Sequence, residues 1–335
     1  MIVLLVAMVL LAVYTFWDNN RITVAEEEIM IDDLPKQLEG FSILQITDLH
    51  EKQFGKNQRR LIDAINSVEY DAIVFTGDML DGIKSKNHQS FYAIIEGISN
   101  KENAWYVPGN ADPESYRVTK GVEKSQFVQG IEERGVSFLE TFDTIEIDGV
   151  SLSFVSFELS IGNVGRTNGI TRPSYSMAKP YLDYQKQLLS EFDEMKDSDV
   201  LIALNHYPVI DNRFDYIANA KDLKLRDYDL LIAGHYHGGQ IRLPYAGALF
   251  VPEAWYTNGG VFPPKDRVKG LWEYKGIQQY VSTGLGSSDA ISFMKFRLFN
   301  PPQINLIKLK KMDKNRTLVP VYQMIWYTSK KVKIG

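Results

Sequence analysis

The sequence contains no cysteine, and this absence removes several kinds of chemistry at once. A disulfide scaffold, a zinc site built on thiolates and a cysteine nucleophile are all excluded. An excess of basic residues is also lacking, because 37 Lys and Arg stand against 42 Asp and Glu, a formal net charge of −5. Proteins that hold nucleic acid through its phosphates usually carry a basic face, so we expect no nucleic-acid partner. Histidine is scarce as well, with five residues, and their positions are therefore informative.

The remaining composition is that of a folded globular protein. Hydrophobic residues make up 44% and charged residues 24%, which excludes disorder, collagen and coiled coil as descriptions of the whole chain. A length of 335 residues is sufficient for one large domain or two ordinary ones. No repeat, low-complexity tract or linker divides the chain after its N-terminal segment. We therefore predict one domain after that segment.

Residues 1–17 contain no charge and almost no polar side chain. As a helix they would be about 25 Å long, slightly less than the hydrocarbon core of a bilayer. Tyr14, Phe16 and Trp17 lie at the distal end, where aromatic rings favour the headgroup region. As a core helix at a chain terminus this run would have no polar face to give to water, and a cleaved signal peptide would carry a basic leader and a small-residue cleavage site. We therefore predict that residues 1–20 anchor the protein in the cell membrane as a single span.

The sequence gives little indication of which way this anchor is oriented in the membrane. Few Lys or Arg residues flank the span, so the positive-inside rule has almost nothing to count. The side on which the catalytic domain lies stays open, with the extracytoplasmic side preferred.

From residue 41 onward, short apolar runs alternate with stretches that have helical spacing. The runs cover residues 41–47, 72–76, 104–107, 200–204 and 230–233, with further strands predicted at 279–282 and 304–309. Leu61, Ile62 and Ile65 share one face of a helix predicted over 57–68. The alternating segment 144–157 contains an Asp-Gly turn and predicts a hairpin. Continuous apolar strands between amphipathic helices predict an α/β fold whose strands are covered on both faces.

Five of these strands are each followed directly by a side chain that can bind a metal ion. These side chains are Asp48 and His50, Asp78, Asn110, His206, and His235 with His237. In open α/β sheets the carboxyl ends of the strands form the edge where ligands bind. Oxygen ligands mixed with imidazoles suit Mn, Fe or Zn better than Ca or Mg. The set is larger than one tetrahedral ion needs, and two adjacent ions that share a bridging carboxylate would use all of it.

A purely structural explanation of these residues is the alternative. A single Asp after a strand is usually a turn residue, and a single His is usually a surface or core residue. That explanation does not account for four of the five histidines falling at strand ends.

These residues, in this order, resemble the calcineurin-like metallophosphoesterase superfamily. The matching segments are Asp-x-His at 48–50, Gly-Asp at 77–78, Gly-Asn at 109–110, the lone His206 and Gly-His-x-His at 234–237. The resemblance runs from about residue 41 to 310, which we take as the domain, with residues 311–335 as a C-terminal extension. It implies a four-layer α/β/β/α sandwich, here preceded by one N-terminal transmembrane helix, with the metal site at the strand ends.

Two segments are similar to one bacterial branch of that superfamily. They are Gly-His-Tyr-His-Gly-Gly-Gln-Ile-Arg-Leu-Pro from residue 234, and Gly-Leu-Gly at 284–286 followed by Arg297, Phe299 and Pro302. The branch consists of membrane-anchored phosphodiesterases, including enzymes similar to UDP-2,3-diacylglucosamine pyrophosphatase. This resemblance implies a phosphate-ester substrate, and the anchor favours a lipid-linked one. Nothing in the sequence indicates the oligomeric state.

The resemblance also implies a role for each ligand. Asp48, His50 and His237 would hold one divalent ion, Asn110, His206 and His235 would hold a second, and Asp78 would bridge the two. We expect Mn, with Zn or Fe as alternatives. The ions would activate a water to attack the phosphorus of a phosphodiester or pyrophosphate diester. Asp78, Asn110 and His206 are the residues expected to be catalytic.

One position departs from the family pattern. The family has His after Gly-Asn, where it contacts the phosphate and is thought to protonate the leaving group, but this chain has Ala111. Loss of a positioned acid typically costs roughly 10²–10⁴-fold in rate, and less when the leaving group is already stable. Three interpretations stay open: hydrolysis continues on good leaving groups, Asp112 or His88 supplies the proton, or the protein binds a phosphorylated or lipid ligand without turnover.

The stretch 244–264 is rich in aromatic residues and proline, including Trp255, Tyr256 and Phe262. It could line an apolar groove for a lipid tail or form an irregular loop packed on the core. We expect packing, because an exposed apolar patch needs independent support.

Overall fold

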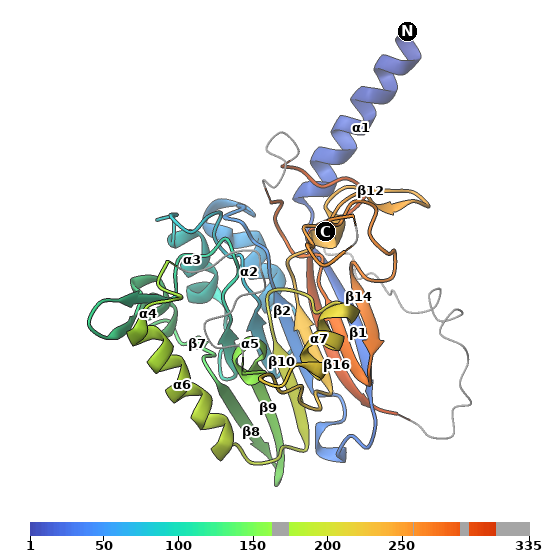
Figure 1. The fold of residues 1–335 in the computed structure, drawn as a ribbon. Coiled ribbons are helices and arrows are strands. Elements are labelled where there is room, and N and C mark those ends of the chain that lie inside the picture. The colour runs from blue at the N-terminus through green and yellow to red at the C-terminus, as the bar shows by residue number, and fades with distance from the viewer. Residues whose placement is uncertain (163–173, 257, 289–294, 313–335) are drawn as a thin grey trace.

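A computed structural model describes residues 1–162, 174–256, 258–288 and 295–312, and its centre is a pair of six-stranded sheets (Figure 1). The first sheet has the order β1 (Thr23–Ile31), β16 (Gln303–Lys311), β2 (Ser42–Ile46), β3 (Ala72–Phe75), β4 (Ala104–Tyr106) and β7 (Ser137–Phe138). The second has the order β14 (Gly270–Tyr274), β15 (Ile277–Val281), β11 (Leu230–Ala233), β10 (Val200–Leu204), β9 (Val150–Ser156) and β8 (Phe142–Ile147). Two short ribbons pair β5 (Tyr116–Val118) with β6 (Val122–Lys124) and β12 (Arg242–Leu243) with β13 (Gly247–Ala248).

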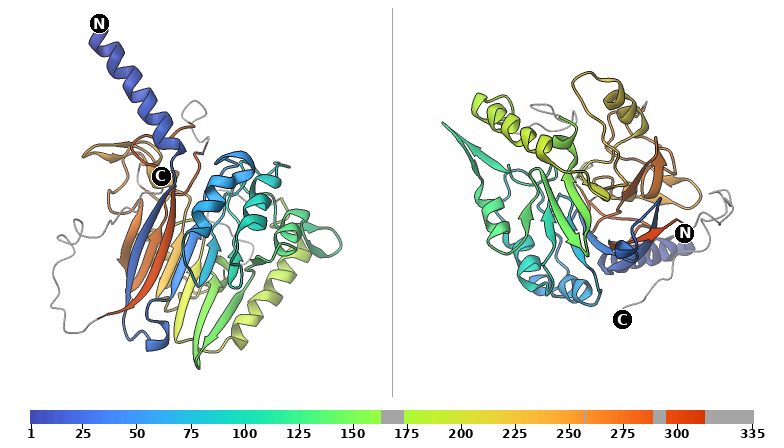
Figure 2. Two further views of the ribbon diagram at one scale, coloured as in Figure 1. Left: turned by 180° about the vertical axis from the view of Figure 1, so that it is seen from behind. Right: turned by 90° about the horizontal axis from the view of Figure 1, so that it is seen from below.

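Helices cover the outer face of each sheet, so the predicted α/β/β/α layers are present (Figure 2). The first sheet carries α2 (Arg59–Asn66), α3 (Gln89–Gly97) and α4 (Gln126–Glu132), and the second carries α5 (Phe157–Ser160), α6 (Lys179–Glu194) and α7 (Asp211–Asn219). Short 3-10 turns complete the described elements: η1 (Lys36–Leu38), η2 (Lys56–Gln58) and η3 (His237–Gly239). Three separate hydrophobic clusters fill the three interfaces between layers.

The strands that carry the predicted ligands are the most buried elements of the molecule. Every residue of β2, β3 and β11 is buried, as continuous apolar runs require when layers cover both faces of a sheet. The two sheets meet directly where the Trp105 ring stacks on Phe154 at 4.4 Å between centroids. The predicted hairpin is also present: Ile147 pairs with Val150, and Asp148 and Gly149 both have positive φ, as a tight two-residue turn requires.

The first sheet contains two strands that the sequence analysis did not predict, the nine-residue β1 and the two-residue β7. β1 pairs in parallel with β16, which is in turn antiparallel to β2. Thr23 lies opposite Gln303, and Asn305 lies opposite Gln45 near the end of β2. The beginning of β1 therefore lies at the same end of the sheet as the carboxyl ends of β2 and β3.

The N-terminal helix α1 (Ile2–Asn20) projects from that end of the sheet (Figure 1). It is long and apolar enough to cross a membrane, and its apolar side chains are exposed. Its last turn is attached to the domain, because the Asn19 side chain donates to the Arg297 carbonyl at 2.6 Å and accepts from the Arg297 N–H at 2.8 Å. Lys52 donates to the Asn19 carbonyl. The predicted C-terminal extension lies outside the described residues from position 313 onward.

Candidate metal centre

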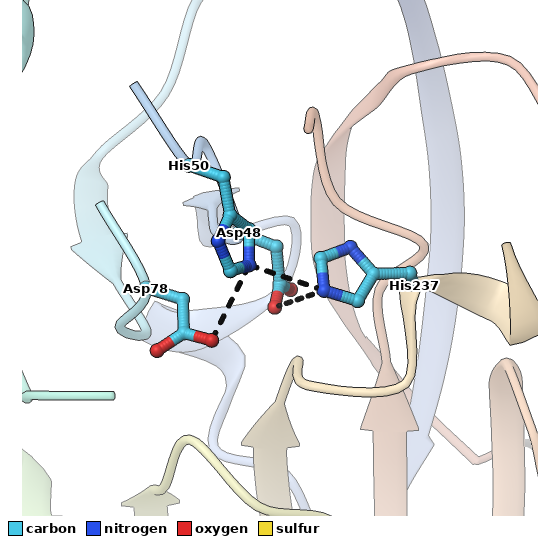
Figure 3. Close-up of side chains that lie close together, drawn as sticks. All are labelled: Asp48, His50, Asp78 and His237. Carbon is cyan, nitrogen blue, oxygen red and sulfur yellow. Dashed lines mark hydrogen bonds and ion pairs between the residues drawn. The ribbon is translucent and has the colours of Figure 1, made fainter. Parts of the chain in front are cut away.

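The loops after the strands bring six of the seven predicted ligands together in two overlapping groups. One group is Asp48, His50, Asp78 and His237, shown in Figure 3, and the other is Asp78, His206 and His235. Within each group, one potential ligand atom per residue lies within 4.8 Å of the others. All six side chains are buried, and Asp78 belongs to both groups. The arrangement is that of two neighbouring cation pockets with one carboxylate in common.

Nitrogen faces nitrogen in each pocket. His50 Nε2 lies 3.2 Å from His237 Nε2, and His206 Nε2 lies 3.1 Å from His235 Nδ1. The Asp78 carboxylate lies between the pairs, with Oδ2 at 3.4 Å from His50 Nε2 and 3.3 Å from His206 Nε2. Two facing imidazole nitrogens need a proton or a metal cation between them, so this donor set fits divalent ions.

The second nitrogen of three imidazoles is held by an acceptor. His50 Nδ1 lies 3.2 Å from Asp81 Oδ1, His206 Nδ1 lies 2.8 Å from the Thr76 carbonyl, and His235 Nε2 lies 3.3 Å from the Pro252 carbonyl. Each contact favours a proton on that nitrogen, so the other nitrogen, which faces the pocket, is the one available to a second proton or to a metal ion. Such outer partners fix the tautomer and the ring orientation of metal-binding histidines.

Asn110 supplies an independent sign of a cation site. Its Oδ1 atom is buried and has no hydrogen-bond partner among the residues that the structure describes. The next residue, Ala111, donates its N–H to Asp78 Oδ1 at 2.7 Å, so this loop runs beside the shared carboxylate. A buried oxygen without a partner costs about 1–3 kcal/mol, and a metal ion would satisfy it.

The ligand loops hold strained backbone. Five of the candidate ligands have φ between 47° and 69°, which L-residues rarely adopt: Asp48, His50, Asp78, His235 and His237. Each such residue costs about 1–3 kcal/mol and persists only where the surrounding structure determines it. Glycine makes the close approach possible, because a Cβ on Gly109 would overlap the Asp78 carboxylate and one on Gly234 would overlap Asp48. The motif glycines therefore allow the ligand loops to touch.

The four histidines divide into two cations and two neutral rings. Burial alone would lower the pKa of His50, but hydrogen bonds to Asp78 and Asp81 raise it to about 10. Burial likewise opposes the charge on His206, yet Asp78 raises its pKa to about 9. Burial and the His206 cation lower the pKa of His235 to about 3.

The same competition between burial and neighbouring charges sets the pKa values of His237, Asp78 and Asp48. Burial and the cationic His50 hold the pKa of His237 well below its usual value. For Asp78, the cost of burial is outweighed by His206 and His50, which lower its pKa. Burial raises the pKa of Asp48 to about 6 against the attraction of His206. His50 and His206 thus carry protons on the nitrogens that would bind metal ions, and metal binding would displace those protons.

The buried guanidinium of Arg297 is hydrogen-bonded to the loop that carries His237. Arg297 donates to the carbonyls of Gly286 at 2.6 Å, Thr283 at 2.7 Å and His237 at 3.3 Å, and it is fully buried. Asn300 also donates to the His237 carbonyl, at 2.6 Å. The sequence analysis included Arg297 in a motif but assigned it no role, and the partner Asp81 was not singled out.

Neither of the two residues considered as replacement acids, Asp112 and His88, belongs to the two groups of candidate ligands. Asp112 is buried and accepts four hydrogen bonds, from the N–H groups of Asp78, Leu80 and Gly109 and from the Tyr106 hydroxyl, at 2.8–2.9 Å. Burial and the charge of Asp78 raise the pKa of Asp112, whereas these donors favour its carboxylate. It ties the Asp78 loop to the Asn110 loop. His88 precedes α3, where its ring contacts Phe127 at 5.1 Å and Tyr92 at 5.7 Å.

The fold and this site define an α/β/β/α domain that holds two cation pockets around one shared carboxylate. The model of the calcineurin-like phosphoesterase family matches residues 41–239, and the chain belongs to that family.

Similar proteins extend beyond the matched segment. The uncharacterized metallophosphoesterase YkuE of Bacillus subtilis (strain 168) is 24% identical over 304 residues, which is 89% of each chain. YkoQ, another uncharacterized metallophosphoesterase of that organism, is 26% identical over 260 residues, 77% of this chain and 80% of YkoQ. Among solved structures, phosphopantetheinyl hydrolase (PptH) from Mycobacterium tuberculosis is 12% identical with a TM-score of 0.41, covering 74% of this chain and 91% of that one.

Proposed function

We propose that this protein is a dinuclear metal-dependent phosphoesterase that hydrolyses a phosphodiester or pyrophosphate diester. The observation that carries the proposal is the buried Asp78 carboxylate shared by two ligand groups, beside the unpartnered oxygen of Asn110. A structural ion pair would not need facing imidazole nitrogens on both sides of one carboxylate.

The residues would divide as the family resemblance implies. Asp48, His50 and His237 would hold one ion, Asn110, His206 and His235 would hold the other, and Asp78 would bridge them. The mixture of oxygen and imidazole ligands favours Mn, with Zn or Fe as alternatives. When bound, the ions would supply Lewis acidity toward the phosphate oxygens and a lowered pKa for an attacking water.

The protein's own residues contribute by orienting the candidate ligands in a buried site. Asp81 and the carbonyls of Thr76 and Pro252 fix the rings of three ligands, so little reorganisation accompanies binding of a phosphate. At position 111 an alanine methyl replaces a side chain that could give a proton to the leaving group. We therefore expect the enzyme to prefer esters whose leaving group is stable as an anion, such as a pyrophosphate linkage.

A cavity beside the candidate centre offers room for the organic part of a diester. It has a volume of about 130 Å³ and includes Asn110 in its wall. Most other lining residues are apolar or aromatic, among them Ile83, Pro108, Pro113, Tyr175 and Tyr207. A phosphate held at Asn110 could place one ester group in this cavity.

We further propose that α1 stays attached as a membrane anchor and that the substrate is lipid-linked, as in the bacterial branch that the sequence resembles. Support comes from the last turn of α1, where Asp18 is fully buried and Asn19 is hydrogen-bonded to Arg297. A signal peptide removed after export would not be expected to end in a turn that belongs to the folded domain.

Ala111 also favours a second candidate, a family member that binds a phosphorylated or lipid ligand without turnover. The two candidates share the metal centre and differ only in whether an ester bond breaks.

The full chain, purified in detergent and loaded with Mn²⁺, separates them. With bis(4-nitrophenyl) phosphate and 4-nitrophenyl phosphate as reporters, we expect faster release of nitrophenol from the diester. Asp78→Ala should abolish release, whereas Asp63→Ala, at an exposed carboxylate of α2, should not change it. Two bound equivalents of Mn²⁺ without hydrolysis of either reporter would contradict the enzyme and favour the binding protein.

A further inference from the structure

Exposed apolar side chains gather around the base of α1. The packing expected for residues 244–264 holds for Val251, which is buried, but not for Phe262, which is 72% exposed. Tyr245, at the turn between β12 and β13, is 99% exposed. We use the name apolar rim for the following exposed residues: Leu243, Tyr245, Val261, Phe262 and Phe299.

Contacts connect the apolar rim to α1 as one surface. The Phe299 ring lies 5.5 Å from the Tyr14 ring of α1. Its neighbour Leu298 forms a β-bridge with Ile241, two residues before Leu243. Figures 1 and 2 both show the β12–β13 ribbon beside the lower part of α1.

The rest of the apolar rim is joined to the same ribbon. Lys265 donates to the Tyr245 carbonyl at 2.6 Å, and Phe262 donates its N–H to the Leu249 carbonyl at 2.9 Å. The rim residues therefore come from segments that hydrogen bonds hold together.

The sheet topology places this surface at the end of the molecule that carries the metal ligands. α1 leads into the beginning of β1, which lies level with the carboxyl end of β2, where Asp48 and His50 follow. Lys52 and Arg297 join the base of α1 to the loops of His50 and His237. A bilayer crossed by α1 would therefore face the metal centre and the apolar rim together.

We propose that the apolar rim is a second membrane contact, which lies in the headgroup region of the bilayer that α1 crosses. The occupant is the bilayer, because the rim continues the apolar surface of α1 through Phe299 and Tyr14. The Tyr245 ring, which has one polar end, favours this depth, and Lys265 beside it would meet lipid phosphates. A large exposed apolar patch in water otherwise marks an interaction site that the protein alone leaves uncovered.

Two membrane contacts would fix the tilt of the domain, which a single helix cannot do. The metal centre would then open at the level of lipid phosphates and not toward bulk water. This inference rests on the anchoring role proposed for α1, but it does not depend on hydrolytic activity.

The absence of cysteine allows a direct test on the full chain. Single variants Tyr245→Cys and Phe262→Cys would be labelled with a nitroxide and reconstituted in vesicles of phosphatidylethanolamine and phosphatidylglycerol. Val9→Cys, within α1, reports the membrane interior, and Gln37→Cys, in the exposed turn between β1 and β2 at the opposite end of the sheet, reports water. The measurement is the accessibility of each nitroxide to oxygen, which is enriched in lipid, and to a water-soluble nickel chelate.

We expect the labels at 245 and 262 to be shielded from nickel several-fold relative to the label at 37, and less than the label at 9. If they match the label at 37 while the label at 9 is shielded, the anchor holds and the rim proposal is wrong. If the label at 9 is also open to nickel, the anchor and the rim proposal fail together. Spin–spin broadening at 245 or 262 that disappears on dilution with unlabelled protein would show that a second copy covers the rim, and would also overturn the proposal.

Discussion

The predicted ligands come from five separate loops, so no local interaction holds them together. What assembles them is the common edge of the two sheets, followed by short polar contacts such as the four hydrogen bonds to Asp112. The sequence could predict which side chains gather at this edge, because carboxylate and imidazole groups directly after apolar runs form a visible pattern. It could not predict the groups that orient them, since the carbonyls of Thr76 and Pro252 exist at every residue and only the fold selects them.

Replacing the shared carboxylate should remove both ions. Asp78→Ala takes away a ligand from each pocket and leaves the cationic His50 and His206 without their counter-charge. We expect metal content near zero by elemental analysis after gel filtration, and a lower melting temperature. Asp63→Ala is the matched control, because its carboxylate is exposed on α2. Two bound equivalents in Asp78→Ala would rule out the proposed bridge.

Restoring the family's histidine should change the dependence on the leaving group. Ala111→His should raise turnover of alkyl phosphodiesters by roughly 10²-fold and barely change that of nitrophenyl esters, which need no proton in the transition state. Metal content should stay the same, because Asn110 is untouched. Ala111→Phe controls for added bulk and should give no gain. If the alanine protein already matches Ala111→His on alkyl esters, another group supplies the proton.

Asp112 should prove to be structural. In Asp112→Asn, the amide group of the new side chain would face N–H donors from two ligand loops, and an unsatisfied buried group costs about 1–3 kcal/mol. We expect a lower melting temperature and an equal loss of activity on good and poor leaving groups. A general acid would behave differently, with an unchanged melting temperature and a loss confined to poor leaving groups. His88→Ala, measured on both classes of ester, tests the other candidate acid in the same way.

At the scale of elements, prediction worked where burial dictates the pattern. β10 and β11 have the predicted bounds, because strands covered on both faces must be continuously apolar. β1 was missed because it is half-exposed at the sheet edge and carries Glu26–Glu28, which do not alternate with apolar residues. The apolar rim was missed for a different reason: composition shows aromatic residues, but only the fold shows which of them face outward.

The contact between the two sheets should be a main source of stability. Phe154→Ala removes the ring that stacks on Trp105 in the buried layer between the sheets, and such truncations cost about 3–5 kcal/mol. Phe262→Ala is the matched control, because that ring is exposed and its loss should change the free energy of unfolding by less than about 0.5 kcal/mol. Urea unfolding followed by circular dichroism measures both. Equal midpoints for the two variants would contradict this account of the interface.

At the scale of the whole molecule, the N-terminal helix α1 and the candidate metal centre are structurally joined. The base of α1 holds Arg297 through Asn19, and Arg297 in turn holds the carbonyl of His237. Lys52, two residues after His50, donates to the Asn19 carbonyl in the last turn of α1. Burial and the nearby Arg297 cation lower the pKa of Lys52 to about 7. Removing the apolar part of α1 and removing its last turn as well are therefore different perturbations, although the two deletions differ by only five residues.

Two truncations separate these effects. Deleting residues 1–17 removes the apolar span but keeps Asp18 and Asn19, so we expect a protein that leaves the membrane fraction with its melting temperature and metal content unchanged. Deleting residues 1–22 also removes the acceptor of Lys52 and both hydrogen bonds between Asn19 and Arg297, so we expect a lower melting temperature and weaker metal binding. The full chain should remain in membranes after high salt and alkaline carbonate, because hydrophobic burial and not charge would hold it. Its release by salt alone would contradict the anchor, and identical melting temperatures for the two truncations would show that the last turn of α1 does not support the metal centre.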